Sequence, residues 1–275
     1  MADSNRRDQV LDQLVDGIAR LTTSDDWRRW LDVQAKFHHY SFGNSLLIMR
    51  QRPEATRVAG FHTWRKLGRC VRKGEKSIWI LAPMTHRVAD DNDDENDGSS
   101  RRILSGFRPV PVFDIAQTDG ETLPDSPVTR LAGEAPEHAY ERLIAVAHGM
   151  GYSVEEDYLP GERNGVCAFD ERCIRVEVTN DAAQQVKTLA HELAHAMLHE
   201  GYSDRALAEL EAESVAFVIM STLGVDSGEY SFGYCATWAG GGDTAIAAIK
   251  ASGQRIQQTA NCILETVTTE QEVAA

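Results

Sequence analysis

The segment that most constrains the fold spans residues 187–199, where His191-Glu192-Leu193-Ala194-His195 lies in an apolar stretch without Gly or Pro. Residues four apart on an α-helix project from one face about one turn apart, so the two imidazoles can bind one metal ion. The adjacent Glu192 then reaches toward the water bound to that ion. The pattern predicts a helix over about 181–200 that carries a zinc site, with His191 and His195 as ligands.

A second helix is predicted over residues 204–220, with Gly224 as its stop. Its three glutamates, Glu209, Glu211 and Glu213, are candidates for the third ligand. Helical phase places Glu211 on the apolar face and the other two on a more polar side. A carboxylate on a core-facing stripe is unfavourable to bury unless it meets a metal or a counter-charge. We therefore predict Glu211 as the third ligand, with Glu209 as the alternative.

Three protein ligands leave a fourth position for water, whose pKa zinc lowers to about 7. Glu192 would take the proton as this water attacks a carbonyl carbon and would later pass it to the leaving nitrogen. His199 extends the histidine ladder by one turn and is expected to be a bystander or a support. The alternatives are a buried helix whose histidines are satisfied by hydrogen bonds and a metal site without hydrolytic activity.

The chain of 275 residues is long enough for two domains, and its 42% hydrophobic content supplies core-forming material. A breaker-rich segment over 118–127 suggests a linker. We predict an α+β fold with two domains, over residues 1–125 and 126–275. The first is expected to contain helices near 8–21, 24–31 and 45–50, and strands near 77–82 and 102–115.

The second domain is expected to contain a small sheet directly before the metal helix. The pattern predicts a helix over 136–149 and strands near 152–154, 166–169 and 173–178. The exposed edge of such a hairpin could hold an extended peptide by strand addition over the metal.

The charge and the termini constrain the setting of the protein. The net charge is −14, and all of the excess acid lies after residue 125. No secretory signal and no apolar run long enough to span a bilayer are visible, so we expect a soluble cytoplasmic protein with no membrane partner. The five scattered cysteines suit a reducing compartment.

Positive charge is concentrated between residues 50 and 76, where aromatic residues are interleaved with the cations. Cations that follow a phosphate backbone, together with aromatic faces for base stacking, are typical of single-stranded nucleic acid binding. The alternative is an ordinary basic surface with core tryptophans, since Trp64 and Trp79 are as compatible with a core as with a stacking platform. The candidate binding residues are Arg57, Trp64, Arg65, Lys66, Arg69, Arg72, Lys73 and Lys76.

Three segments in this order, residues 64–76, 112–118 and 187–195, resemble ArdC-type antirestriction proteins. That family joins an amino-terminal domain that binds single-stranded DNA to a zincin-like metallopeptidase domain similar to the ImmA/IrrE regulators, and it is associated with plasmids and mobile elements. The segment Glu211-Ala212-Glu213-Ser214 also looks like the glutamate segment of gluzincins. The resemblance implies a zinc cofactor, single-stranded DNA as a partner, with duplex DNA as a further candidate, and an unidentified protein substrate.

Two functions remain open at this point. The first is a DNA-tethered zinc peptidase; the second is a non-catalytic protein that shields single-stranded DNA and uses its metal only for structure. This sequence departs from the family pattern in the acidic run over 90–97, which lies in a loop expected near 88–100. Such a loop could cover the basic surface in the absence of DNA.

Overall fold

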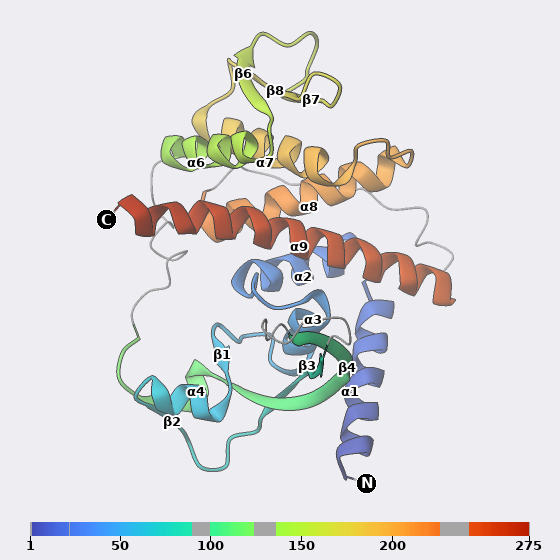
Figure 1. Ribbon diagram of the computed structural model, residues 1–275, viewed down its shortest axis with the longest axis vertical. Coiled ribbons are helices and arrows are strands. Elements are labelled where there is room, and N and C mark those ends of the chain that lie inside the picture. Colours follow the sequence, from blue (N-terminus) through green and yellow to red (C-terminus); the bar gives the residue numbers. More distant parts are fainter. Residues whose placement is uncertain (1, 22, 90–99, 124–135, 226–241, 275) are drawn as a thin grey trace. The chain divides into compact units, whose positions relative to one another are not determined.

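The computed structural model describes residues 2–21, 23–89, 100–123, 136–225 and 242–274, so the acidic run at 90–97 lies outside the described residues. The chain divides into two compact units (Figure 1). Unit 1 comprises Met1–Gly17 and Leu46–Glu121, and unit 2 comprises Ile18–Ser45 and Thr122–Ala275. The fold is α+β, as the sequence predicted. The division differs from a single boundary near residue 125, because the segment 18–45 packs within unit 2.

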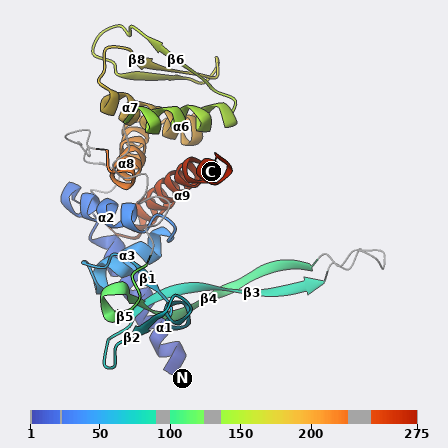
Figure 2. The same ribbon diagram turned by 90° about the vertical axis from the view of Figure 1, so that its left-hand side faces the viewer.

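The amino-terminal part of the chain combines helices with a long two-stranded ribbon. Strands β3 and β4 pair antiparallel, with one register shift between Met84 and Thr85, and β1 adds to the other side of β4. Figure 2 shows β3 and β4 extending together well beyond the other elements of unit 1. The elements are α1 (Ala2–Ala19), α3 (Phe42–Gln51), β1 (Val58–Ala59), α4 (Phe61–Lys66), β2 (Arg69–Val71), β3 (Ile78–Ala89), β4 (Ser100–Asp114), η1 (Ile115–Gln117) and β5 (Thr118–Gly120).

Asp114, at the end of β4, fixes the local fold of unit 1. Its buried carboxylate accepts hydrogen bonds from the backbone N–H groups of Thr56, Arg57 and Ala116 at 2.8, 3.0 and 3.0 Å. Gln117 completes a capping box by returning its side-chain oxygen to the Asp114 N–H. A carboxylate can be buried here because several donors satisfy it. The segment 112–118 therefore has a structural role.

Unit 2 places a three-stranded sheet against helices. In the order β6-β8-β7, β6 runs parallel to β8 and β7 runs antiparallel, so β7 forms an edge of the sheet. Figure 1 shows α6 and α7 side by side on one face of this sheet. The elements are α2 (Ser24–Lys36), α6 (Pro136–Gly149), β6 (Ser153–Asp157), β7 (Gly165–Ala168), β8 (Cys173–Glu177), α7 (Ala182–Leu198), α8 (Arg205–Leu223) and α9 (Gly242–Ala274).

The two predicted helices α7 and α8 begin and end where their caps dictate. Asp181 accepts a hydrogen bond from the N–H of Gln184, and Asp204 accepts one from the N–H of Leu207. Gly224 ends α8 in the left-handed conformation, with φ of 68°, which an L-residue with a Cβ rarely adopts. These caps fix the helical phase, and therefore the direction in which the site residues project.

Aromatic side chains of α2 and α3 complete the core of unit 2. The Trp27 indole N–H donates to the Ser214 hydroxyl of α8 at 2.9 Å, and the Trp30 ring meets the Phe42 ring edge-on at 5.1 Å. Gly253 of α9 receives Phe42, because a Cβ on this glycine would lie 2.3 Å from the Phe42 ring. The first and last thirds of the chain therefore share one core.

Helix α9 was not predicted from the sequence, although the core positions Ile249, Ile256, Ala260 and Ile263 follow helical spacing. Among the described helices, none combines the length and the apolar character that a membrane span requires.

Candidate metal centre

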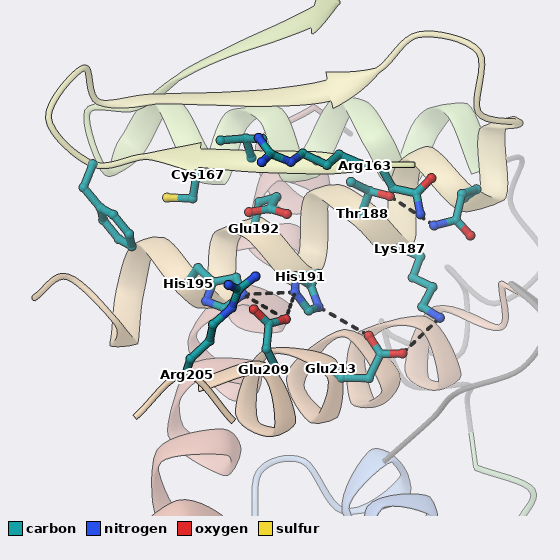
Figure 3. Close-up of a pocket in the computed structure, with 15 residues that line it drawn as sticks. Arg163, Cys167, Lys187, Thr188, His191, Glu192, His195, Arg205, Glu209 and Glu213 are labelled. Atoms are coloured by element: carbon teal, nitrogen blue, oxygen red, sulfur yellow. Dashed lines mark hydrogen bonds and ion pairs between the residues drawn. The ribbon is translucent and has the colours of Figure 1, made fainter. Parts of the chain in front are cut away.

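Two histidines of α7 and one glutamate of α8 converge in unit 2. The Nε2 atoms of His191 and His195 lie 3.0 Å apart, and Oε2 of Glu209 lies 3.4 Å from the first and 3.8 Å from the second. One potential ligand atom from each residue lies within 4.8 Å of the others. Figure 3 shows both rings turned toward Glu209. Two imidazole nitrogens and one carboxylate oxygen match the donor set of a catalytic zinc site.

The structure places Glu209, the alternative third ligand, beside the histidine pair and turns Glu211 away from it. Glu211 is fully buried, as its helical phase predicted, but its carboxylate accepts hydrogen bonds from Ser252 and Arg255 of α9 and contacts His199. The counter-charge of Arg255 satisfies this buried acid, so its burial does not require a metal. Although burial raises the pKa of Glu211, the bonds from His199, Arg255 and Ser252 outweigh it and hold this pKa below its usual value.

Glu213 supports the opposite side of His191. Its Oε2 lies 3.3 Å from His191 Nδ1, and its Oε1 lies 3.1 Å from Lys187 Nζ. Burial lowers the pKa of His191, but hydrogen bonds with Glu209 and Glu213 outweigh it and raise this pKa to about 9. The same contacts with His191, and then with His195, hold the pKa of Glu209 well below its usual range. The cluster is therefore electrostatically prepared for a cation.

Glu192 lies on the side of α7 that faces β7 (Figure 3). It is only 8% exposed, and burial raises the pKa of its carboxyl group, partly offset by His191, by His195 and by a hydrogen bond from the backbone of Cys167. Gly165 of β7 makes this approach possible, since a Cβ there would lie 2.8 Å from Glu192 Oε1 and 2.5 Å from Thr188 Cγ2. A glycine at this position thus lets the edge strand pass directly over the carboxylate.

A pocket of about 610 Å³ opens around these residues. One wall is the strand β7 with its flanking residues, and the other comprises α7 and the start of α8. Burial raises the pKa of Cys167 to about 12, with Glu192 adding to the effect, so its thiol is protonated at neutral pH. The lining residues are Arg163, Asn164, Gly165, Val166, Cys167, Phe169, Gln184, Lys187, Thr188, His191, Glu192, His195, Arg205, Glu209 and Glu213.

In unit 1, three residues of the expected DNA-binding set have partners within the protein. Trp64 is 2% exposed and donates its indole N–H to the Phe113 carbonyl, so its ring cannot stack on a base. The Arg69 guanidinium donates to the Thr118 hydroxyl and to backbone carbonyls of β5. Arg72 forms ion pairs with Glu75 at 2.8 Å and with Asp119 at 3.2 Å. These two arginines hold β2 and the turn after it against η1 and β5.

The other exposed cations of the expected set lie on α4 and in the segment around the turn after β2. On α4, Arg65 and Lys66 are exposed, and each lies one turn after an exposed aromatic residue, Phe61 and His62 respectively. The Phe61 and His62 rings meet edge-on, with centroids 5.7 Å apart. Of the other candidates, Lys73 and Lys76 are exposed and Arg57 is half-buried.

The expected DNA-binding set contained Trp64 and left out Phe61 and His62. Sequence reasoning considered Glu213 only as a metal ligand and did not assign Lys187, Gly165 or Arg255 to the metal centre. The i,i+4 spacing of Lys187 and His191 places both on one face of the helix, where each contacts Glu213. No local signal linked Arg255 to Glu211, which precedes it by 44 residues.

An HExxH helix packed beside a small sheet, with a glutamate donated by the next helix, defines a metallopeptidase-like domain, here joined to an α+β amino-terminal part. Family models agree with both parts: residues 4–113 match the N-terminal domain of anti-restriction factor ArdC, and residues 140–223 match the IrrE N-terminal-like domain. The two matches, in this order along the chain, give it the domain organisation of an ArdC-type antirestriction protein.

The chain is also similar, at low identity and over most of its length, to individual proteins of known sequence or structure. The Mn(II)-bound crystal structure of the antirestriction ArdC protein from plasmid R388 is 22% identical, with 83% of this chain and 89% of that chain covered and a TM-score of 0.50. Its metal-free structure is 20% identical, with 84% and 86% covered and a TM-score of 0.49. An uncharacterized Bacillus anthracis protein, pXO2-81, is 25% identical over 94% of this chain; the chain spans about half (51%) of that relative's length.

Proposed function

We propose that this protein is a zinc-dependent peptidase that binds single-stranded DNA and hydrolyses a peptide bond in a protein partner as its antirestriction activity. The convergence of His191, His195 and Glu209 beside the buried Glu192 carries this proposal. The metallopeptidase-like domain and the match to the ArdC N-terminal domain support it, and the Mn(II)-bound relative shows that a protein of this fold holds a divalent metal.

The residues of the centre fit zinc in particular. Imidazole nitrogens suit zinc better than magnesium or calcium, and two histidines with one glutamate leave a position open to solvent. The half-exposed Glu209 lies on the pocket side of the cluster. Zinc held there would polarise a substrate carbonyl and acidify water at neutral pH. The remaining chemistry belongs to the side chains around it.

Glu192 is the proposed general base. Its raised pKa lies closer to neutral pH than that of a free carboxyl group, and a group with such a pKa can both accept and return a proton. In the proposed reaction it takes a proton from the attacking water and delivers it to the nitrogen of the departing amine, so that the C–N bond breaks to give a carboxylate and an amine. The backbone hydrogen bond from Cys167 orients the carboxylate for both transfers.

Strand β7 is the proposed docking edge for an extended substrate. It pairs with β8 on one side, while its residues line the pocket over α7. An extended peptide added to this free edge would make main-chain hydrogen bonds and pass over the histidine pair. Such binding selects an unfolded or loop segment of the partner, because a folded helix cannot add to a sheet edge.

The exposed face of α4 is the proposed contact for single-stranded DNA. Phe61 and His62 offer faces on which bases can stack, and Arg65 and Lys66 lie one helical turn away to meet the phosphates. Lys73 and Lys76 extend the cationic surface, and half-buried Arg57 stays in the proposed set. In this proposal the cations of unit 1 hold nucleic acid, and unit 2 carries the hydrolytic chemistry.

A Glu192→Gln variant tests the hydrolytic function. We expect it to fold and bind zinc like the wild type, while hydrolysis falls on the order of 10²–10⁴-fold and the antirestriction effect in cells is lost. Glu200→Gln, an exposed change just beyond the same helix, is the matched control. Full protection by Glu192→Gln, combined with loss in His191→Ala, would instead assign the metal a structural role in DNA shielding.

A further inference from the structure

Three glutamates of α8, each two residues from the next, occupy three different positions around the histidines. Glu209 reaches the shared point of His191 and His195, and Glu213 reaches the far nitrogen of His191. Glu211 points to the other side of the helix, where it contacts His199. The alternation places carboxylates on both sides of the helix, and only one of them is available as a ligand.

The far nitrogen of His195 meets another imidazole. His195 Nδ1 lies 2.9 Å from Nδ1 of His199, and Nε2 of His199 lies 3.2 Å from Oε2 of Glu211. A hydrogen bond between two nitrogens requires that exactly one of them carries the proton. A metal on Nε2 of His195 leaves the proton on Nδ1, so His195 donates to His199. His199 then carries its proton on Nε2 and donates it to Glu211.

Glu211 is firmly held at the far end of this chain of contacts. It is 0% exposed, its Oε2 accepts from Arg255 Nε at 3.0 Å, and the Ser252 hydroxyl donates to its Oε1 at 2.5 Å. The Tyr202 ring lies against these contacts, with its centroid 5.4 Å from that of His199 and 6.0 Å from the Arg255 guanidinium carbon. Buried charge-assisted bonds of this kind restrict side-chain geometry more than exposed ones.

We propose that Glu211 and His199 are positioning residues for the metal centre: they form a relay that fixes the tautomer and orientation of His195. The inference rests on the metal site of the proposed function. The relay links α9 to the site, because Ser252 and Arg255 hold Glu211 and Glu211 holds His199. His191 receives the corresponding support from Glu213 and Lys187. His191 is therefore supported directly by Glu213, which pairs with Lys187. His195 is supported through His199 by Glu211, which pairs with Arg255.

Zinc affinity of the purified full-length chain, measured by competition with a chelator, tests the relay. Glu211→Gln keeps the volume and removes the charge, and we expect it to bind zinc about 10–100-fold more weakly. Thr222→Val is the matched control, since Thr222 is a buried hydrogen-bonding residue of the same helix that bonds to Ala35 and Val218 and not to the relay. This control is expected to keep wild-type affinity for zinc.

A double variant, Glu211→Gln with Arg255→Met, separates positioning from loss of stability. Removing both charges relieves the unpaired guanidinium, so the melting temperature of the metal-free protein should recover toward the wild-type value while zinc affinity stays low. Recovery of zinc affinity along with stability would overturn the relay. So would zinc binding by Glu211→Gln within about twofold of the wild type, since supporting residues of metal ligands have larger effects.

Nitrogen NMR shifts of the metal-free protein give a second readout. The relay requires the proton of His195 on Nδ1 and that of His199 on Nε2; the opposite tautomer at either ring contradicts it. These outcomes are separable from those of the proposed function. A wild type that binds zinc but hydrolyses nothing sinks the peptidase and leaves the relay standing, whereas a wild type without zinc affinity sinks both.

Discussion

The metal centre of unit 2 and the basic segment of unit 1 use similar charged residues in opposite ways. Charged residues of the centre on α7 and α8 meet partners on the facing helix: Glu213 pairs with Lys187, and Glu209 with the histidines. Between residues 50 and 76, charges lie on short elements, and Arg69 and Arg72 are occupied in holding β2 and β5. The contrast teaches that spacing on a regular helix predicts geometry, whereas local composition predicts only that charge is present.

The largest expected effect comes from removing the ligand that sequence analysis ranked second. Glu209→Ala should lower zinc affinity by more than about 100-fold, beyond the effect at a supporting residue, because it deletes one of three donors. Metal content after dialysis and chelator competition measure this. Comparable losses of zinc affinity in Glu209→Ala and Glu211→Gln would contradict the assignment of Glu209 as a ligand and Glu211 as a supporting residue.

Two aromatic residues of α4 sharpen the difference between core and surface. Trp64→Ala should lower the free energy of unfolding by about 3–5 kcal/mol, because it empties a buried site. Phe61→Ala should change stability by less than about 0.5 kcal/mol, since Phe61 is 43% exposed. The same change should weaken oligonucleotide binding by about 1–3 kcal/mol if Phe61 stacks on a base. Denaturant melts and fluorescence titrations separate these outcomes, and unaltered DNA affinity in Phe61→Ala counts against the platform.

A single methyl group at Gly165 tests the close approach of β7 to Glu192. Gly165→Ala should displace the strand or the carboxylate and lower stability by about 1–3 kcal/mol, as overpacking does. Hydrolysis should fall while zinc affinity is kept, because no metal ligand moves. Gly161→Ala would be a poor control, as its φ of 80° adds backbone strain, so Ala168→Gly on the same strand is preferable. Unchanged hydrolysis in Gly165→Ala would show that β7 need not lie so close.

Exposed and occupied cations of unit 1 should differ in salt dependence. Lys73→Gln and Lys76→Gln are each expected to reduce the slope of log affinity for single-stranded DNA against log salt by about 0.7. Arg72→Gln should leave the slope nearly unchanged, because its charge is already balanced by Glu75 and Asp119. Equal effects at Arg72 and Lys73 would mean that the intramolecular ion pairs open when DNA binds.

The smallest expected effect is a pH dependence of the metal-free protein. A proton on His191 stabilises the fold fully below its ordinary pKa of 6.5, and this contribution is lost as the pH rises through about 9. The melting temperature of the metal-free chain should therefore drop by about 2–4 °C over that range for each kcal/mol involved. His191→Gln provides the baseline, since its curve should lack this component. Identical curves would exclude the contribution.

Sequence reasoning located the metal helix and its partner because their signals are local. The capping residues Asp181, Asp204 and Gly224 and the spacing of His191 and His195 sufficed. Helical phase also placed Glu211 correctly in the core. The prediction let a metal satisfy that buried charge, whereas in the structure it is paired with Arg255, on a helix that sequence analysis did not predict.

The basic segment was harder for a physical reason. Tryptophan is compatible with both a core and an exposed platform, so composition could not show that Trp64 is buried and bonded to the Phe113 carbonyl. Likewise, no pattern in Arg69-Cys70-Val71-Arg72 distinguishes guanidinium groups that bind phosphate from those that cap a neighbouring strand. Such roles depend on β5, some fifty residues further along the chain.

The meeting of Phe42 and Gly253 has a practical consequence for dissecting the protein. A fragment starting near residue 122 would carry His191, His195 and Glu209, yet it would lack the Phe42 ring that packs against Gly253. Without that contact, the position of α9 along its axis is no longer fixed, and neither is the position of Arg255. Unit 2, which carries the candidate metal centre, is thus discontinuous in the sequence, and any truncation intended to isolate it has to include the segment 18–45.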